Sequence, residues 1–263
     1  MESPLPSFDR PPVVEVVMGV QFQPLEFSTS HIALFWETVR SAYPDCTDNP
    51  PIVSQIEDFT RPAALRDMGV QLTQVPPVPR VFFIDSGGNW LIQLQRDRFL
   101  HNWRSTSVDD PYPRYPAVLE RFFAQWSNFR QLVSKYEGLG DIKVNQFEIT
   151  YLNHIDEWTD DSDLGELFPD FQWRKGERLL TRPEAYNISC AFTTSDKRAR
   201  LRATIRPGIH KEKGNILLFE LTVRGAPEPD DLEASFDQGR RWIVTAFADL
   251  TSEKWHKKWG RTE

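Results

Sequence analysis

Residues 81–103, VFFIDSGGNWLIQLQRDRFLHNW, predict an antiparallel meander. The apolar run 81–84 is followed at residues 85–89 by a turn cluster, DSGGN, whose glycines accept positive φ angles at little cost. Apolar and polar side chains then alternate over residues 90–95, the two-residue period of a strand with one buried face. Residues 99–103 predict a third strand or an extension of the second. The stretch therefore places a set of antiparallel strands in the first half of the chain.

Hydrophobic periodicity predicts further strands and helices on both sides of this meander. Residues 13–22 alternate with one fully apolar face and a partly apolar second face, which is typical of a central strand. Residues 115–136 place large apolar side chains three and four positions apart, the strongest helical pattern of the chain. The other predicted elements are a helix from 28–30 to 43, a strand at 142–155 with a bulge near Asn145 and Gln146, a short helix at 164–168, strands at 186–194, 198–205 and 216–224, a connection at 207–214, a long helix at 231–250 and a short helix at 252–259.

The proline-rich residues 45–79 interrupt this pattern. They contain few periodic positions, so we expect a long irregular connection. This connection has two candidate edge strands, near 52–58 and near 68–74.

The order of predicted elements repeats. Each half contains a strand, a helix or helical turn, a meander and a long helix, which predicts an internal duplication with halves at 1–138 and 139–263 joined in one integrated unit. The two meanders would form one large curved antiparallel sheet with both long helices on one face. We therefore predict an α+β fold of the TATA-binding-protein-like or helix-grip kind.

Composition excludes two classes of protein. The 263 residues include 31 basic and 38 acidic side chains, a formal charge of −7, which excludes a broadly basic nucleic-acid coat. A hydrophobic fraction of 40%, with 9 Trp, 6 Tyr and 18 Phe, excludes a disordered chain. Two cysteines give no disulfide framework, and neither a leader pattern nor an apolar run of membrane length occurs. We expect a cytoplasmic protein with no membrane partner.

The chain lacks the usual signatures of catalysis and cofactor binding. Its five histidines are far apart, without the spacing of a zinc site, and neither GxGxxG after a strand nor GxxxxGK[ST] occurs. The acidic residues between 156 and 163 lack the glycine-centred ligand ladder of a calcium loop. We therefore expect no metal, no cofactor and no catalytic residue.

One predicted strand carries a strip of arginines. Arg198, Arg200 and Arg202 alternate with apolar residues and should project from one sheet face. Glu220 and Arg224 on the next strand are candidate cross-strand partners. The strip is either a solvated, ion-paired sheet face or a concave anion-binding surface.

A second group interleaves arginine with aromatic residues. Its candidate partner-binding members are Arg98, Trp103, Arg104, Tyr112 and Arg114. The pattern suits single-strand stacking, a protein interface or internal packing, and the net charge favours protein over nucleic acid.

Two tryptophans near the C-terminus form a third candidate surface. Trp255 and Trp259 share a helical face, because they lie four residues apart. They either dock on the body of the protein or contact a partner.

Six blocks of sequence carry a resemblance to a known family. They are PPVVEV at 11–16, GVQF at 19–22, QLQRDRF at 93–99, NWR at 102–104, YPRY at 112–115 and WGR at 259–261. Together they resemble a sporadically distributed bacterial family of about 250 residues that has no assigned activity. Patchy distribution of this kind implies an accessory gene, as in toxin-antitoxin and anti-phage loci.

These observations favour a non-catalytic module that binds another protein, as an antitoxin, immunity or phage-defence component. A second copy of the chain is an alternative partner. A small-molecule or enzymatic pocket between sheet and helix, with polar groups from Arg200, Arg202, His154 and Glu148, is the alternative function. Single-stranded nucleic-acid binding is the second alternative.

Overall fold

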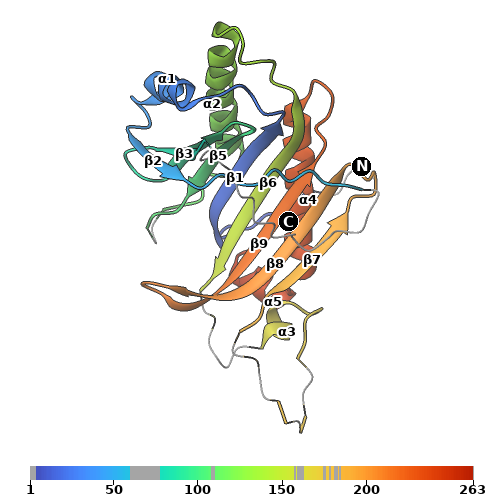
Figure 1. Cartoon of the computed structure of the whole chain (residues 1–263). Helices are drawn as coiled ribbons and strands as arrows, with labels where there is room; N and C mark the ends of the chain where they lie inside the picture. Colours follow the sequence, from blue (N-terminus) through green and yellow to red (C-terminus); the bar gives the residue numbers. More distant parts are fainter. Residues whose placement is uncertain are drawn as a thin grey trace.

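The computed structural model describes residues 4–59, 78–107, 110–156, 158, 163–173, 176–177, 179–180, 183 and 185–262. They form an α+β fold with a nine-stranded antiparallel sheet and helices packed mostly on one of its faces (Figure 1). The strands are β1 (Val13–Phe22), β2 (Asp45–Asn49), β3 (Arg80–Ile84), β4 (Trp90–Gln95), β5 (Arg98–Arg104), β6 (Val144–Ile155), β7 (Ile188–Thr193), β8 (Ala199–His210) and β9 (Gly214–Gly225). The helices are α1 (Thr29–Val39), α2 (Tyr115–Lys135), α3 (Leu164–Leu167), α4 (Leu232–Leu250) and α5 (Glu253–Lys258).

The sheet is arranged around the pair β1 and β6. Its full order is β2-β3-β4-β5-β1-β6-β9-β8-β7, and every pairing is antiparallel. Reading outward from the central pair, β1 is followed by β5, β4, β3 and β2, and β6 by β9, β8 and β7. The hairpin strands predicted at the DSGGN turn are β3 and β4, which pair as expected.

The bulge predicted in the strand at 142–155 is confirmed. β1 and β6 pair through Gln21 and Gln146, but the next pair is Phe22 with Val144, so Asn145 has no opposite residue. The extra residue shifts the register, which explains why the apolar positions before it are out of phase with those after it.

Two sequence predictions are wrong. The connection predicted at 207–214 is mostly strand, because β8 continues through Pro207 to His210 and pairs with β9. Pro207 is tolerated there because β7 pairs with β8 only as far as Ile205, so no strand needs a donor from Pro207 on that side. No strand forms at 52–58, where an edge strand was predicted. The edge strand of this region is β2, which lies earlier in the chain, at Asp45–Asn49. The strand predicted near 68–74 lies outside the described residues.

The core lies between the sheet and the two long helices. Phe99 of β5 contacts Phe122 and Phe129 of α2, and Phe236 of α4 contacts Phe122 and Phe147. Gly239 lets α4 approach the sheet closely, because a Cβ there would lie 2.9 Å from Ile149. The two long helices therefore cover one face of the sheet (Figure 1). No helix of the described residues is long and apolar enough to cross a membrane.

Candidate functional site

The face of the sheet opposite the long helices, the open face, carries a row of polar side chains across six strands. The row crosses strands in spatial order because neighbouring strands place these residues opposite or next to one another. Each of these side chains is buried although it faces away from the core. The members are Gln95 of β4, Arg98 of β5, Gln21 of β1, Gln146 and Glu148 of β6, Arg224 of β9 and Arg200 of β8.

Residues 50–59, the crossing segment, cover this row. Figure 1 shows the chain leaving β2 and running across the sheet, transverse to the strands. The Gln95 side chain accepts from the Ile52 N–H at 3.0 Å and donates to the Ile52 carbonyl at 2.9 Å. These are the two bonds that a neighbouring strand would exchange with Ile52.

Two further glutamines bind the same backbone. Gln21 Oε1 accepts from the Gln55 N–H at 3.0 Å, and Gln146 Oε1 accepts from the Glu57 N–H at 2.9 Å. The Gln146 amide also donates to the Gln55 carbonyl. Since all these bonds reach the main chain, the glutamines hold an extended peptide without reading its side chains.

Arginines bind the one acidic side chain that the crossing segment buries here. The Glu57 carboxylate is 5% exposed and lies 2.8 Å from Arg200 Nη1. Arg202 Nε donates to it at 3.0 Å, and Arg224 Nη1 lies 3.8 Å away. Carboxylates accept such bonds well because the guanidinium group offers several fixed donors.

A second carboxylate completes this cluster. Glu148 lies 2.9 Å from Arg224 Nη2 and 3.7 Å from Arg98 Nη1. Four guanidinium groups therefore meet two carboxylates, and Glu57 is one of the two. Removing it would leave buried positive charge, which is costly unless another anion takes its place.

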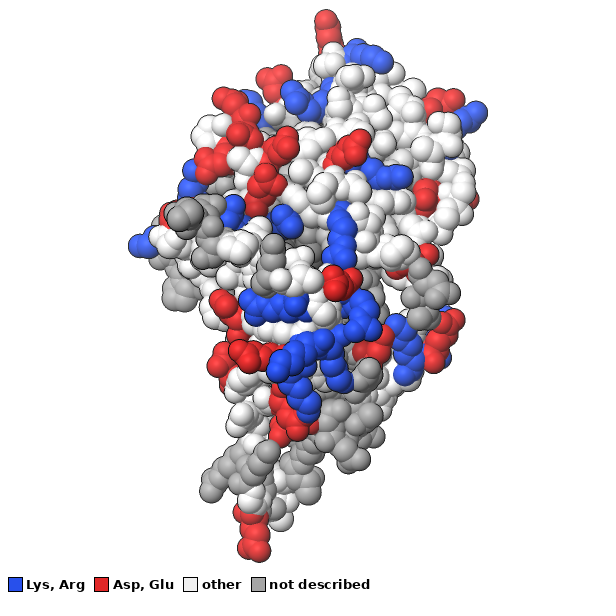
Figure 2. Space-filling model, turned by 180° about the vertical axis from the view of Figure 1, so that it is seen from behind, with Lys and Arg blue, Asp and Glu red and all other residues white. Residues whose placement is uncertain are grey.

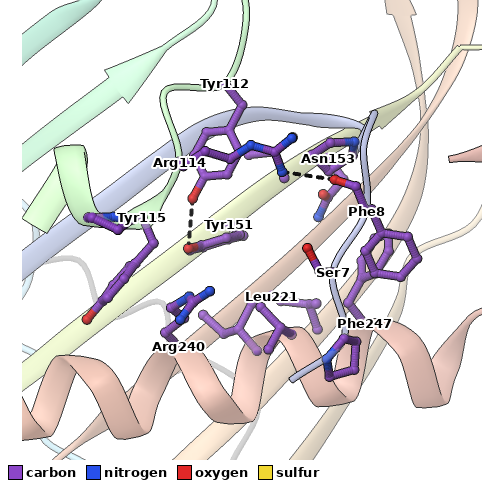
Figure 3. A pocket seen from close by; sticks show the side chains of 16 residues that line it. Ser7, Phe8, Tyr112, Arg114, Tyr115, Tyr151, Asn153, Leu221, Arg240 and Phe247 are labelled. Atoms are coloured by element: carbon purple, nitrogen blue, oxygen red, sulfur yellow. Dashed lines mark hydrogen bonds between the residues drawn. The ribbon is translucent and has the colours of Figure 1, made fainter. Parts of the chain in front are cut away.

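A pocket of about 130 Å³ lies on the helix side of the sheet (Figure 3). It is bounded by α4, by the N-terminal residues 6–13, by the first residues of α2 and by β6. Its polar groups are Ser7, Tyr112, Arg114, Tyr115, Tyr151, Asn153 and Arg240. The rest of the lining is largely apolar.

The tyrosines of this pocket form hydrogen bonds at its wall. The hydroxyls of Tyr112 and Tyr151 are 3.0 Å apart, and the Tyr115 hydroxyl donates to Asp237 at 2.8 Å. Burial raises the pKa of Tyr112, Tyr115 and Tyr151 above the ordinary value. All three are therefore neutral hydroxyls at physiological pH.

The two arginines of the pocket have different surroundings. Arg114 donates to the Phe8 carbonyl at 2.9 Å (Figure 3) and to the Asp9 carbonyl at 3.0 Å, and these bonds hold the N-terminal residues in place. The Arg240 guanidinium lies 4.8 Å from the centre of the Tyr115 ring. No carboxylate of the described residues forms an ion pair with Arg240.

The structure brings together only part of the predicted arginine strip. Arg200 and Arg202 meet at Glu57, but Arg198 precedes β8 and pairs with Glu228 at 2.6 Å. Arg224 lies opposite Arg200, and Glu220 lies opposite Thr204.

The predicted partner-binding residues lie in several places. Arg98 is buried on the open face, where it donates to Gln21, and Arg104 donates to the Gly88 carbonyl. Trp103 is buried against Tyr112, whose ring centre is 5.4 Å away. Of this group, Tyr112 and Arg114 line the pocket.

The C-terminal tryptophans dock on the body of the protein. Trp255 and Trp259 are buried, with 8% and 7% of their surface exposed. Their rings lie 5.7 Å apart, and Trp259 also packs on Phe247 and Phe8. Of the two roles that the sequence left open for them, the structure shows docking.

The polar groups expected for a pocket between sheet and helix lie elsewhere. Glu148, Arg200 and Arg202 belong to the open face, and His154 has the same strand parity as Glu148. They therefore do not line the pocket beside α4, where Tyr151, Asn153 and Arg240 do so instead.

Sequence reasoning missed the glutamines and Glu57. Gln95 was visible on the polar face of its strand, but residues 50–59, which it binds, show no periodic pattern. Side chains that meet a transverse segment cannot be found from strand alternation alone, because alternation reports only the face.

Comparison with protein families and with curated proteins identifies no relative, so the function of the chain is inferred from its geometry. A scan against protein-family models returns no match, and a search of curated proteins returns none either. Within the described part of the chain, no group of three or more His, Cys, Asp or Glu side chains could hold a metal ion.

Proposed function

We propose that this chain is a non-catalytic protein-binding module whose open face takes up an extended acidic segment of a partner. One observation carries the proposal: the chain's own residues 52–57 are bound there as a ligand would be. Glutamine amides bind the main chain, and Arg200, Arg202 and Arg224 surround Glu57.

The chemistry of the open face defines the partner. Main-chain bonds to Gln21, Gln95 and Gln146 supply affinity for any extended peptide, and the arginines select a carboxylate. A partner segment would therefore place an acidic side chain about five residues after its first main-chain contact, the spacing between Ile52 and Glu57.

The crossing segment would then act as an internal competitor. A tethered segment competes at an effective concentration in the millimolar range. A partner must displace residues 50–59 before it binds, so the described arrangement is the closed state of the module.

The finer fold assignment is also a proposal. Two halves, 1–138 and 139–263, related by duplication are supported by the central pair β1 and β6 and by the matched orders on either side. A helix-grip or TATA-binding-protein-like relationship rests on the two long helices covering one face of the sheet. A bacterial cytoplasmic partner, in an antitoxin, immunity or phage-defence setting, suits the sporadic family that the sequence resembles.

Recovery of the partner from the native host tests the proposal. The chain is tagged at native expression as wild type, Glu57→Gln, Arg202→Gln and Arg198→Gln. The tagged chain should recover a partner protein in a stable stoichiometric complex. The amount of this partner should be greater with Glu57→Gln, because the internal competitor is weakened, and smaller with Arg202→Gln. Arg198→Gln is the matched control, since Arg198 pairs with Glu228 away from Glu57.

Two results would contradict this function. One is recovery of the chain alone in every variant. The other is bound material that nuclease removes and whose affinity falls steeply with salt, which identifies single-stranded nucleic acid instead.

A further inference from the structure

We propose that the pocket beside α4 binds a small organic acid, about the size of a benzene ring, through its carboxylate and through one hydrogen-bond donor. This site is on the other side of the sheet from the open face and does not depend on the proposed protein partner. Four features of the pocket, and the strained backbone beside it, support this site.

The first feature is a cation that faces the pocket without an acidic partner. Arg240 contacts the ring of Tyr115, and no carboxylate among the described residues pairs with it. The Tyr115 hydroxyl already donates to Asp237, but Tyr112 and Tyr151 share a single hydrogen bond, which leaves one of their two hydroxyl hydrogens for a ligand. A carboxylate entering the pocket would therefore meet the guanidinium group and that hydroxyl together.

The second feature is the charge around the pocket. Figure 2 shows Lys and Arg side chains gathered over the C-terminal helices on the helix face, although the chain carries a formal charge of −7. Lys257 and Lys258 end α5, and Arg10 donates to the Lys258 carbonyl. A local positive region of this kind attracts anions.

The third feature is a buried hydrogen-bond acceptor, the side-chain oxygen of Asn153, that has no donor within the described structure. Asn153 lines the pocket with 1% of its surface exposed. Its Nδ2 donates to the Phe219 carbonyl at 3.0 Å, which fixes the amide orientation. Its Oδ1 has no hydrogen-bond partner within the described structure. Buried acceptors are nearly always satisfied, so Asn153 calls for a ligand with an N–H or O–H.

The fourth feature is size and lining. The volume of about 130 Å³ is close to that of an engineered cavity that holds benzene. Leu221, Ile243, Val244 and Phe247 contribute apolar walls. The ligand therefore combines an apolar body with its polar groups.

The backbone around the pocket is held under strain. Arg114, the residue that precedes α2, has φ at 72°, a conformation that residues other than glycine rarely adopt. Its guanidinium group holds Phe8 and Asp9, and Phe8 pairs with Arg261 near the other end of the chain. Strain kept by such bonds is typical of ligand sites.

Calorimetry with matched probes tests the proposal on the full chain. The probes are 4-hydroxybenzoate, its neutral amide 4-hydroxybenzamide, benzoate, inorganic phosphate, and a tripeptide with a free or amidated C-terminus. We expect 4-hydroxybenzoate to bind at least tenfold more tightly than the amide and more tightly than benzoate, which lacks the donor for Asn153.

Variants assign the binding to the pocket. Arg240→Gln should weaken 4-hydroxybenzoate at least tenfold, and Arg241→Gln, on the same helix but outside the lining, should leave it unchanged. Asn153→Leu should make benzoate and 4-hydroxybenzoate bind alike. If the tripeptide acid binds and the free acids do not, the carboxylate belongs to a peptide terminus; the reverse assigns a free small acid.

Three results would overturn the inference. They are equal binding of acid and amide, equal losses in Arg240→Gln and Arg241→Gln, and binding of phosphate alone. Failure of every probe would overturn it as well, provided that the unfolding curve shows the chain to be folded.

Discussion

Glu57 and Arg200 are 143 residues apart in the chain and form a buried ion pair, with 2.8 Å between Oε2 and Nη1 and 5% of each side chain exposed. The pair joins the crossing segment to the second half of the sheet. Because Arg202 and Arg224 share the same carboxylate, one glutamate partly offsets the charge of three arginines, of which Arg200 and Arg224 are buried.

Replacing this glutamate should destabilise the fold. Glu57→Gln leaves the arginines without their carboxylate, so we expect the free energy of unfolding in denaturant to fall by about 3 kcal/mol. The matched control is Glu166→Gln, which breaks the exposed pair with Lys254 and should cost less than about 1 kcal/mol. An equal decrease in the free energy of unfolding for the two variants would mean that the buried ion pairs of Glu57 stabilise the fold no more than an exposed pair does.

Hydrogen exchange should reveal the glutamine contacts. The amides of Ile52, Gln55 and Glu57 should exchange slowly although they lie in no strand, because each donates to a glutamine side chain. Gln21→Met should speed exchange at Gln55 by about tenfold, which corresponds to the loss of about one hydrogen bond. Exposed Gln23→Met is the control and should change nothing. Fast exchange at all three amides in the wild type would contradict the bound state of the segment.

Acid should destabilise the protein through His101. Burial, and secondarily the charge of Arg121, lowers the pKa of His101 from 6.5 to about 3. The unfolded chain therefore takes up a proton near pH 6.5 and the folded chain does not until about pH 3. The free energy of unfolding should fall as pH decreases through this window, by about 1.4 kcal/mol per pH unit at most.

The contribution of His101 is isolated by substitution. In His101→Gln the decrease between pH 6.5 and pH 3 should be shallower, and what is left includes the smaller effects of His154 and His256, whose pKa values burial also lowers. His31→Gln is the control, because Gln keeps the capping box at the start of α1. An unchanged slope in His101→Gln would refute the assignment.

Close packing of α4 should make Gly239 intolerant of a methyl group. A Cβ there would lie 2.9 Å from Ile149 and 3.1 Å from Phe147, so Gly239→Ala should lower the free energy of unfolding by about 1–2 kcal/mol despite the better helix propensity of alanine. Exposed Gln238→Ala on the same helix should be close to neutral. A thermal or denaturant curve that shows Gly239→Ala to be more stable would mean that the helix can move away from the sheet.

Local patterns predicted the elements because burial of one face determines the spacing of apolar residues. The strand at 13–22 and the helix at 115–136 were readable for this reason, as was the bulge at Asn145. β2 was missed because its residues, DCTDN, are polar and disfavoured in strands.

The sites were less predictable than the fold because they join residues that are distant in sequence. Glu57 has no local feature that marks it, and its arginines were found without their partner. Trp255 and Trp259 show the same helical spacing whether they dock or remain exposed. The pocket forms where residues 6–13 meet α4, and no local pattern reports a contact between segments so far apart in the sequence.

Binding of the crossing segment in trans tests the central claim most directly. A labelled peptide of residues 50–59, PPIVSQIEDF, is titrated by fluorescence anisotropy into the Glu57→Gln chain, whose own segment is weakened. We predict binding at least tenfold tighter than that of the same peptide with Glu57→Gln, and loss of this difference when the chain also carries Arg200→Gln. Equal binding of the two peptides, or equal binding by wild type and Glu57→Gln chains, would contradict the account.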